Sequence, residues 1–145
     1  MTIGRSTRAV RNANPGNLRY VAANSWLGLA ASPEDDHGYC RFIDPKFGFR
    51  ALILLLRNYG KRYGLSTIGA VVPRFAPAAD NNNEAAYIKH LEDLTGRDRR
   101  TPLDFDDQSE MKSLARAIAV HESGRWAFET ADLDAGCVLA FAMQE

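Results

Sequence analysis

The chain has 145 residues, a length that fits one domain with a single hydrophobic core. Hydrophobic residues make up 46% of it and charged residues 25%, and eighteen basic side chains balance eighteen acidic ones. This is an ordinary globular composition, and it lacks the basic excess that is typical of nucleic-acid binders.

The first third of the sequence is predicted to hold a short arm and a small β lobe. Residues 1–11 are expected to form a mobile or loosely attached arm, and residues 12–145 a single domain. Residues 12–43 are rich in Asn, Gly and aromatic side chains, with short patches at 17–20 and 39–43. Such a segment is typical of turns that connect one or two β-hairpins.

Two helices are predicted in the middle of the chain. Asp44 suits an N-cap and Pro45 a first helical position, and apolar residues then recur every three or four positions until Gly64. A shorter helix is expected to be capped by Ser66, and Pro73 and Pro77 are expected to end or kink it.

Three further helices are predicted in the C-terminal half. The first follows the asparagine run 81–83 and ends before Gly96, and the second spans about 109–123. The third is expected to be capped by Thr130. The chain is therefore predicted to be a mostly α protein of the α+β class, with about five helices and a small β-hairpin lobe.

Glu122 is the residue on which the functional prediction depends. The predicted helix 109–123 carries an apolar stripe made of Met111, Leu114, Ala115 and Ile118. Glu122 lies four residues beyond the last of these and continues the stripe, so burial and the helix dipole should both raise its pKa. A carboxylic acid that keeps its proton near neutral pH can protonate a leaving sugar oxygen. A solvated helix end is the alternative, and the adjacent His121 is expected to be exposed.

A longer pattern resembles a known family. It comprises Arg11 to Tyr20 (RNANPGNLRY), Trp26 to Gly28, Phe42, Gly48 to Leu52 (GFRAL), Ala76 and Pro77, Asn81 to Asn83, Tyr87 and Ile88, and His121 to Gly124 (HESG). Over nearly the whole chain it is similar to phage-borne and prophage-encoded virion-type proteins, which are lysozyme-like peptidoglycan hydrolases. Glu122 and Ser123 also resemble the catalytic Glu-Ser of lytic transglycosylases and flagellar-type glucosaminidases. In those families the Glu helix comes first, so the resemblance implies a circular permutation.

The resemblance implies a lysozyme-like fold and an enzyme, a muramidase or lytic transglycosylase that cleaves the peptidoglycan glycan strand with Glu122 as its acid. It also implies a cleft whose amide, guanidinium and aromatic groups bind the sugars. The candidates are Asn14, Asn17, Arg19, Tyr20, Trp26, Asn81, Asn82 and Tyr87. Turn chemistry for the asparagines, and core packing for Trp26 and Tyr87, are the alternatives.

A second carboxylate is used by most glycosidases. Glu34, Asp35 and Asp36 lie in a loop after the first predicted hairpin, and Asp36 is the candidate, although acids in an exposed loop are usually just solvated. Lytic transglycosylases need no second acid, because one Glu donates the proton and later removes one from the substrate's own hydroxyl.

Two other functions compete with this one. A cysteine amidase would pair Cys40 with His37, His90 or His121, but no thiol lies at a predicted helix N-terminus, where its pKa would fall. Cys40 and Cys137 are instead expected to be free, part-buried thiols.

The other alternative is a non-catalytic virion or cell-wall-binding module. The spacing of His and Cys does not suggest a metal site, and we expect no metal and no cofactor.

The expected partners are peptidoglycan glycan strands, with other virion or secretion components as further candidates and with neither nucleic acid nor a membrane. No apolar run follows the early arginines, so we expect no signal peptide and no transmembrane span. The protein would then be made in the cytoplasm and reach the cell wall or periplasm in a phage particle, through a holin or by a secretion machine.

Overall fold

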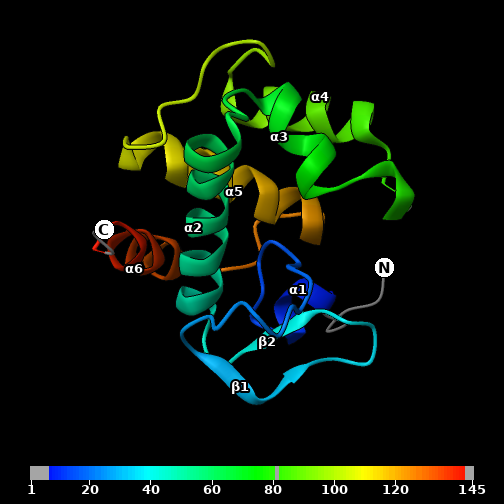
Figure 1. Cartoon of the computed structure of the whole chain (residues 1–145), viewed down its shortest axis with the longest axis vertical. Coiled ribbons are helices and arrows are strands. Elements are labelled where there is room, and N and C mark those ends of the chain that lie inside the picture. The colour runs from blue at the N-terminus through cyan, green and yellow to red at the C-terminus, as the bar shows by residue number, and fades with distance from the viewer. Residues whose placement is uncertain (1–6, 81, 143–145) are drawn as a thin grey trace.

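The computed structural model of the protein describes residues 7–80 and 82–142. These residues form six α-helices, one short 3-10 helix and one two-stranded antiparallel sheet, which confirms the predicted mostly helical α+β class (Figure 1). The elements are α1 (Arg8–Arg11), β1 (Leu29–Glu34), β2 (Cys40–Phe42), α2 (Pro45–Tyr63), α3 (Ile68–Phe75), η1 (Ala78–Asp80), α4 (Glu84–Thr95), α5 (Gln108–Ser123) and α6 (Thr130–Phe141). No helix in the described ranges is long and apolar enough to cross a membrane.

Helix α2 is the centre of the fold, and Figure 1 shows it upright in the middle with α6 beside it. Asp44 caps it by accepting a hydrogen bond from the backbone N–H of Lys46 (2.9 Å), and Gly64 ends it in the left-handed conformation at φ 67°. Its completely buried apolar side chains include Phe49, Leu52, Ile53 and Leu56. Gly136 lets α6 approach closely, because a Cβ there would lie 2.5 Å from the Cβ of Phe49.

A small β lobe, formed by residues 12–43, lies at the N-terminal end of α2 (Figure 1). Strands β1 and β2 pair antiparallel, with Leu29 opposite Phe42, and a bulge interrupts the register. An isolated bridge between Arg19 and Tyr39 ties the loop that follows α1 to the hairpin. The predicted hairpin lobe is therefore present, and its loop after α1 lies against the strands.

The predicted N-terminal arm is shorter than expected. Residues Arg8–Arg11 form α1, and Ala9 within it is completely buried. The hydroxyl of Thr7 donates a hydrogen bond to the hydroxyl of Ser123 at the end of α5 (3.3 Å). Residues 7–11 thus belong to the folded domain, which corrects the predicted boundary after residue 11, and residues 1–6 lie outside the described residues.

Three details at helix ends differ from the predictions. Thr67, rather than Ser66, caps α3 through its side chain. Pro73 does not end α3, because its missing N–H removes only one hydrogen bond; the helix continues to Phe75, two residues before Pro77, the other predicted breaker. Thr130 is the first residue of α6 and not its cap. Each difference is small, and none alters the order of the elements.

Candidate active site

Helix α5 places Glu122 at the end of a buried face. Asp107 caps the helix by accepting a hydrogen bond from the N–H of Glu110 (3.1 Å), and Gly124 ends it in the left-handed conformation. The predicted stripe is buried along its whole length, at Met111, Leu114, Ala115 and Ile118. Glu122 continues this face in the last turn and is itself only partly exposed.

Two side chains from other parts of the chain hold the Glu122 carboxylate. The hydroxyl of Tyr87, on α4, donates a hydrogen bond to Oε2 at 2.6 Å, and Nδ2 of Asn17, in the β lobe, donates one to Oε1 at 2.8 Å. Tyr87 is only 1% exposed, so its hydroxyl is committed to this contact. The carboxylate is fixed in one orientation, while lone pairs on both oxygens remain for a proton or a ligand.

Burial is the largest influence on the ionisation of Glu122. Loss of contact with water raises the pKa of this carboxyl above its usual value. The hydrogen bonds from Tyr87 and Asn17, and the charge of Arg8, lower it without cancelling the effect of burial. Glu122 therefore keeps its proton to a higher pH than an exposed glutamate does, which is the property that a general acid needs.

Two histidines pack behind Tyr87. The expectation that His121 is exposed is wrong, because its ring is partly buried and stacks on the ring of Tyr87 with centroids 3.7 Å apart. Its Nδ1 lies 2.9 Å from Nδ1 of His90, so one of these nitrogens must accept. Burial, and then the neighbouring His90, lowers the pKa of His121. A neutral His121 brings no positive charge near Glu122 that would lower the pKa of the acid.

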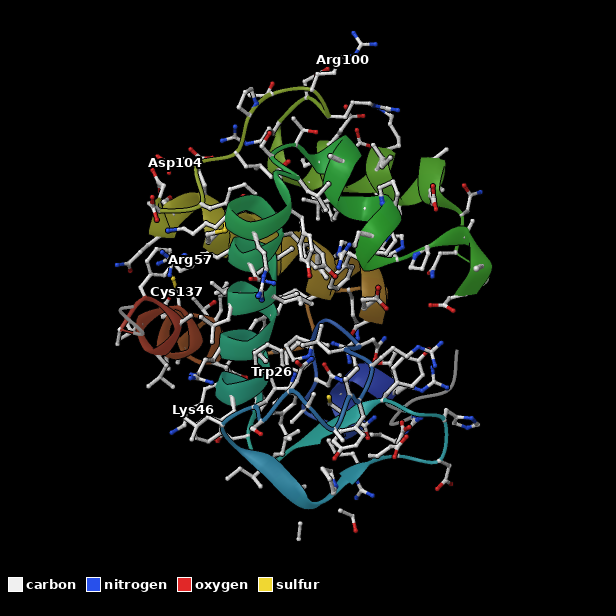
Figure 2. The ribbon with its side chains drawn as sticks, viewed as in Figure 1. Trp26, Lys46, Arg57, Arg100, Asp104 and Cys137 are labelled. Carbon is white, nitrogen blue, oxygen red and sulfur yellow. The ribbon has the colours of Figure 1, made fainter. Side chains whose placement is uncertain are left out.

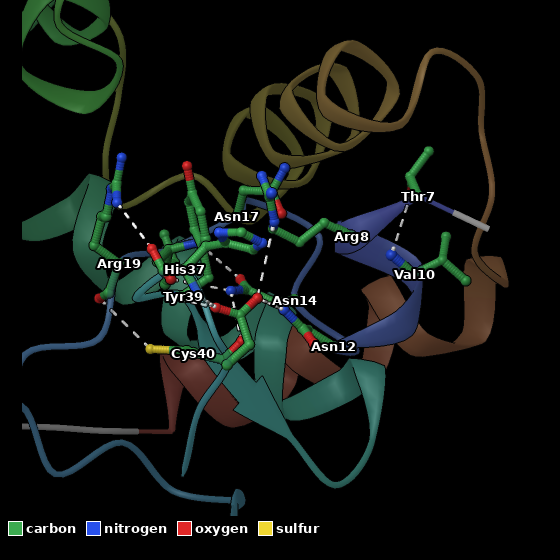
Figure 3. A network of polar contacts seen from close by, with 12 residues as sticks. Thr7, Arg8, Val10, Asn12, Asn14, Asn17, Arg19, His37, Tyr39 and Cys40 are labelled. Carbon is green, nitrogen blue, oxygen red and sulfur yellow. Dashed lines mark hydrogen bonds and ion pairs between the residues drawn. The ribbon is translucent and has the colours of Figure 1, made fainter. Parts of the chain in front are cut away.

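Asn14 folds the loop that carries Asn17. Its Oδ1 accepts a hydrogen bond from the N–H of Leu18 (2.9 Å), and its Nδ2 donates to the carbonyl oxygens of Leu18 (3.1 Å) and Cys40 (3.0 Å; Figure 3). Asn17 then adopts φ 48°, a left-handed conformation that asparagine tolerates better than most residues. Asn14 is completely buried, so turn chemistry accounts for it and its predicted contact with sugar is not available in this arrangement.

Glu122 lines a small pocket that adjoins a larger one. The small pocket, of about 60 Å³, also includes Asn82. The larger pocket, of about 240 Å³, is lined by Trp26 and Arg74 among others. The residues that line both pockets are Asn17, Arg19, Phe75 and Asp80. Because they share these walls, the two pockets form one depression between the β lobe and the segment that follows α3, which we call the groove.

The groove collects part of the predicted set of binding residues, namely Asn17, Arg19, Trp26 and Asn82. Tyr87 lies in the core behind Glu122, and Tyr20 packs against the core and lines neither pocket. Asp36 is exposed and lines a different surface pocket, so the structure gives no support to it as a second acid. Asn81 lies outside the described residues. Sugar binding by the residues of the groove stays a prediction.

Asp35, next to the predicted Asp36, organises the hairpin loop. Its Oδ1 accepts hydrogen bonds from the N–H groups of His37 (2.8 Å) and Tyr39 (2.9 Å), and its Oδ2 accepts one from Nδ2 of Asn12 (2.8 Å). Burial is the largest single influence and opposes ionisation, but these hydrogen bonds and the charge of Arg8 together outweigh it and lower the pKa of Asp35 to about 2. This acid has a structural role.

Sequence reasoning misses two charged residues of the groove. Asp80, in η1, forms an ion pair with Arg19 of the β lobe, with Oδ1 and the guanidinium nitrogen 3.9 Å apart. Arg74, in the last turn of α3, lies over the ring of Tyr63 at 3.8 Å from its centroid. Neither residue belongs to a local motif, because each reaches the groove only through the packing of α3 and η1 beside the β lobe.

The structure contradicts the cysteine-enzyme alternative. Cys40 is completely buried, and its burial, followed by the charges of Glu34 and Asp35, raises the pKa of the thiol to about 11. A thiol that stays protonated and out of contact with solvent is a poor nucleophile. Cys40 and Cys137 are both free, as predicted, and both are buried where only partial burial was expected. Within residues 7–80 and 82–142, no three His, Cys, Asp or Glu side chains cluster in a way that could hold a metal ion.

Comparison with known proteins relates the chain to a bacteriophage protein. It is 32% identical over 103 residues to protein P5 of Pseudoalteromonas phage PM2, and the match covers 70% of this chain. The chain spans 63% of the length of that relative. No protein-family model matches the sequence. The chain is a distant homologue of a bacteriophage protein.

Proposed function

We propose that the protein is a peptidoglycan glycosidase, a muramidase or a lytic transglycosylase, in which Glu122 protonates the leaving sugar oxygen. The observation that carries this proposal is a buried carboxylic acid, at the wall of a groove, whose pKa is raised by burial. Cleavage of a glycosidic bond needs such a proton, because the leaving oxygen would otherwise depart as a strongly basic anion.

The surroundings of Glu122 stabilise both its protonated state before the proton transfer and its ionised state after it. Before the transfer, burial favours the neutral acid. After it, the hydrogen bonds from Tyr87 and Asn17 become charge-assisted and stabilise the new carboxylate. Neither donor has to move, so the site is organised in advance for the charge that develops on the acid.

The groove offers the kinds of groups that bind sugars. Trp26 provides an aromatic face, and Asn17 and Asn82 provide amides beside the acid. Asp80 is the other carboxylate among the described residues of the groove, and it is paired with Arg19. A mechanism in which Glu122 acts first as acid and then as base would need no second carboxylate.

The relation to a phage protein supports a place in or near a virion. We infer that the protein acts on the bacterial cell wall and associates with other virion or secretion components. A non-catalytic wall-binding module is the second candidate function. It is favoured by the fact that both oxygens of Glu122 already have hydrogen bonds from the protein, as they would in a purely structural carboxylate.

The test is Glu122→Gln, which removes the exchangeable proton and nearly preserves the shape of the side chain. We expect a folded protein whose rate of peptidoglycan solubilisation, measured by turbidity, falls by about 10²–10⁴-fold. The matched control is Glu129→Gln, since Glu129 is an exposed glutamate at the start of α6 that makes no side-chain cap bond. Mass spectrometry of the fragments distinguishes hydrolysis from formation of an anhydro end.

Near-normal turnover by Glu122→Gln would contradict the proposed acid. A wild-type protein that sediments with peptidoglycan and releases no fragments would favour the non-catalytic module instead. The two outcomes differ in whether the wild-type protein is active at all, so one set of measurements separates them.

A further inference from the structure

We propose that the larger pocket of the groove is a subsite for a sugar that carries a carboxylate, with Arg74 and Arg19 as the groups that recognise the anion. This inference rests on the proposed function for the identity of the sugar, which is the muramic acid of peptidoglycan. The proposed subsite would select a sugar with a carboxylate over a neutral sugar.

The larger pocket has the size and walls of a site for a single sugar unit. Its volume of about 240 Å³ is below the ~300–1,000 Å³ of pockets for drug-sized ligands. Trp26, Leu55 and Phe75 contribute apolar surface, against which the carbon face of a sugar ring can pack. Shared walls connect it to the pocket of Glu122, so a sugar bound here would neighbour the sugar at the acid.

Arg74 is a cation at this pocket without an acidic partner. Its guanidinium lies over the ring of Tyr63, 3.8 Å from the centroid, and 5.4 Å from the ring centroid of Tyr59. No carboxylate of residues 7–80 and 82–142 lies within ion-pair distance of it. One N–H group of Arg74 also interacts with the hydroxyl of Tyr59. Stacking uses the face of the guanidinium, so its remaining N–H groups lie on the edge, which is the part that binds carboxylates in a two-pronged way.

Arg19 has a carboxylate partner that a ligand can replace. The Arg19–Asp80 pair is long, at 3.9 Å, and its two side chains are 50% and 43% exposed, so it contributes little. The ring of Tyr39, 4.4 Å from the guanidinium carbon, and the carbonyl oxygen of His37 (3.3 Å) hold Arg19 independently of Asp80. A ligand carboxylate could therefore take the place of Asp80 without displacing the arginine.

The charges of the groove are divided between its two ends. Among the described residues that line the larger pocket, Arg74 and Arg19 face a single carboxylate, Asp80, which leaves one of these positive charges uncompensated. At the small pocket, burial raises the pKa of Glu122, which favours its neutral form over a negative charge there. An anionic substituent is thus attracted to the larger pocket and away from the acid.

This arrangement would fix the register of a glycan strand. Muramic acid alternates with a neutral sugar along peptidoglycan, and it carries a lactyl carboxylate that is either free or joined to a peptide stem with carboxylates of its own. If only muramic acid binds beside the two arginines, the strand cannot bind after a shift by one sugar, because the neutral sugar would then lie in the larger pocket. Glu122 would then meet one of the two kinds of glycosidic bond and not the other.

The test measures binding, by calorimetry, in a Glu122→Gln background, where turnover is expected to be too slow to disturb the measurement. The probes are the disaccharide of N-acetylglucosamine and N-acetylmuramic acid with a free lactyl carboxylate, its primary lactyl amide, and the same disaccharide with a peptide stem. We expect the free acid to bind about tenfold more tightly than the amide. Arg74→Gln should abolish this preference. Asp80→Asn, which removes the competing anion, should strengthen binding of the acid by about two- to fivefold.

The control is Arg100→Gln, since Arg100 is an exposed arginine at the top edge of the molecule in Figure 2, far from Trp26. Two results would overturn the proposed subsite. One is that the free acid and the amide bind equally tightly and that Arg74→Gln does not change the affinity for the peptide-bearing probe. The other is that the Arg74→Gln variant still binds the free acid more tightly than the amide. If the bare disaccharide shows the dependence on Arg74, the anion is the lactyl group; if only the peptide-bearing probe shows it, the anion belongs to the stem. Full activity of Glu122→Gln would remove the proposed acid and leave this binding result unchanged.

Discussion

Replacing Tyr87 by Phe removes one hydrogen bond from Glu122 and leaves the rest of the site in place. The ring still stacks on His121 and still meets the edge of Phe75, because neither contact uses the hydroxyl. What disappears is the 2.6 Å hydrogen bond to Oε2 of Glu122. That bond lowers the pKa of Glu122, so the variant should have an acid whose pKa is raised further.

The size of the effect depends on the charge of the acid. A hydrogen bond to a charged group contributes about 1.5–3 kcal/mol, and one between neutral groups about 0.5–1.5 kcal/mol. Tyr87→Phe should therefore lose more stability where Glu122 is ionised than where it is protonated, by roughly 1 kcal/mol. The linkage between protonation and folding gives the sign of this pH dependence. A carboxyl whose pKa is raised in the folded protein contributes stability at low pH, and this contribution is lost as the pH rises. Tyr87→Phe raises the pKa of Glu122 further, so the variant should lose more stability than the wild type between low and high pH.

Urea unfolding of the wild type and the variant at pH 4 and pH 8 measures the difference. Tyr59→Phe is the matched control, because Tyr59 is also a buried tyrosine but its hydroxyl does not contact Glu122, so its deficit should be the same at both pH values. In an activity profile, the decline at alkaline pH should move to higher pH in Tyr87→Phe. An equal deficit at both pH values, or an alkaline decline that moves to lower pH, would refute the reasoning.

Two further predictions concern the framework around the site. Asp35→Asn should lower the free energy of unfolding by about 1–2 kcal/mol at pH 7. The difference between wild type and variant should narrow as the pH falls towards 2, because the wild type then loses the contribution of a carboxylate whose pKa is lowered to about 2. Urea unfolding at pH 7 and near pH 2 checks this, and equal stability of the two proteins at pH 7 would contradict it. Gly136→Ala should destabilise the fold by about 1–3 kcal/mol, since the new methyl group would lie 2.5 Å from the Cβ of Phe49 and 2.8 Å from the carbonyl oxygen of Lys46. Thermal unfolding measures this loss of stability. Gly69→Ala is the milder control, because its added Cβ would lie 3.3 Å from the nearest atom. An unchanged Tm of Gly136→Ala would show that α6 can move away from α2.

The parts of the structure that the sequence predicted are those with local signals. Helix α2 has a cap, a wide apolar stripe and a terminal glycine, and α5 has the stripe that Glu122 continues. Helix α1 has no such signal, because four residues are too few for a period to be recognised. It is held by the burial of Ala9 and by the contact of Thr7 with Ser123, and neither is visible before the fold is known.

The same distinction holds within the candidate site. Glu122 could be predicted from periodicity, but its partners Tyr87 and Asn17 lie 35 and 105 residues away, so only the family resemblance pointed to them. Asn14 and Asn17 have the same side chain and adjoin the same turn, yet one is buried in backbone contacts and the other reaches the acid. Composition and spacing cannot separate two such residues, because the difference is set by the turn itself.

The acid helix meets the N-terminal part of the chain through direct contacts, between Thr7 and Ser123 and between Asn17 and Glu122. Both contacts join residues more than a hundred positions apart, so the proposed site depends on the packing of α5 against the N-terminal segment and the β lobe.

Two carboxylates of this protein show how the proposed acid differs from a structural one. Asp35 has three hydrogen bonds and a nearby arginine, which lower its pKa, so its charge stabilises the fold at neutral pH. Glu122 is more deeply buried and has two hydrogen bonds, and its pKa is raised, so its ionised form opposes folding. A residue retained only for stability would be expected to resemble Asp35, or to be replaced by an uncharged side chain at the end of an apolar helix face. A buried acid that costs stability as the pH rises, and that faces a groove, is better explained by chemistry that needs its proton.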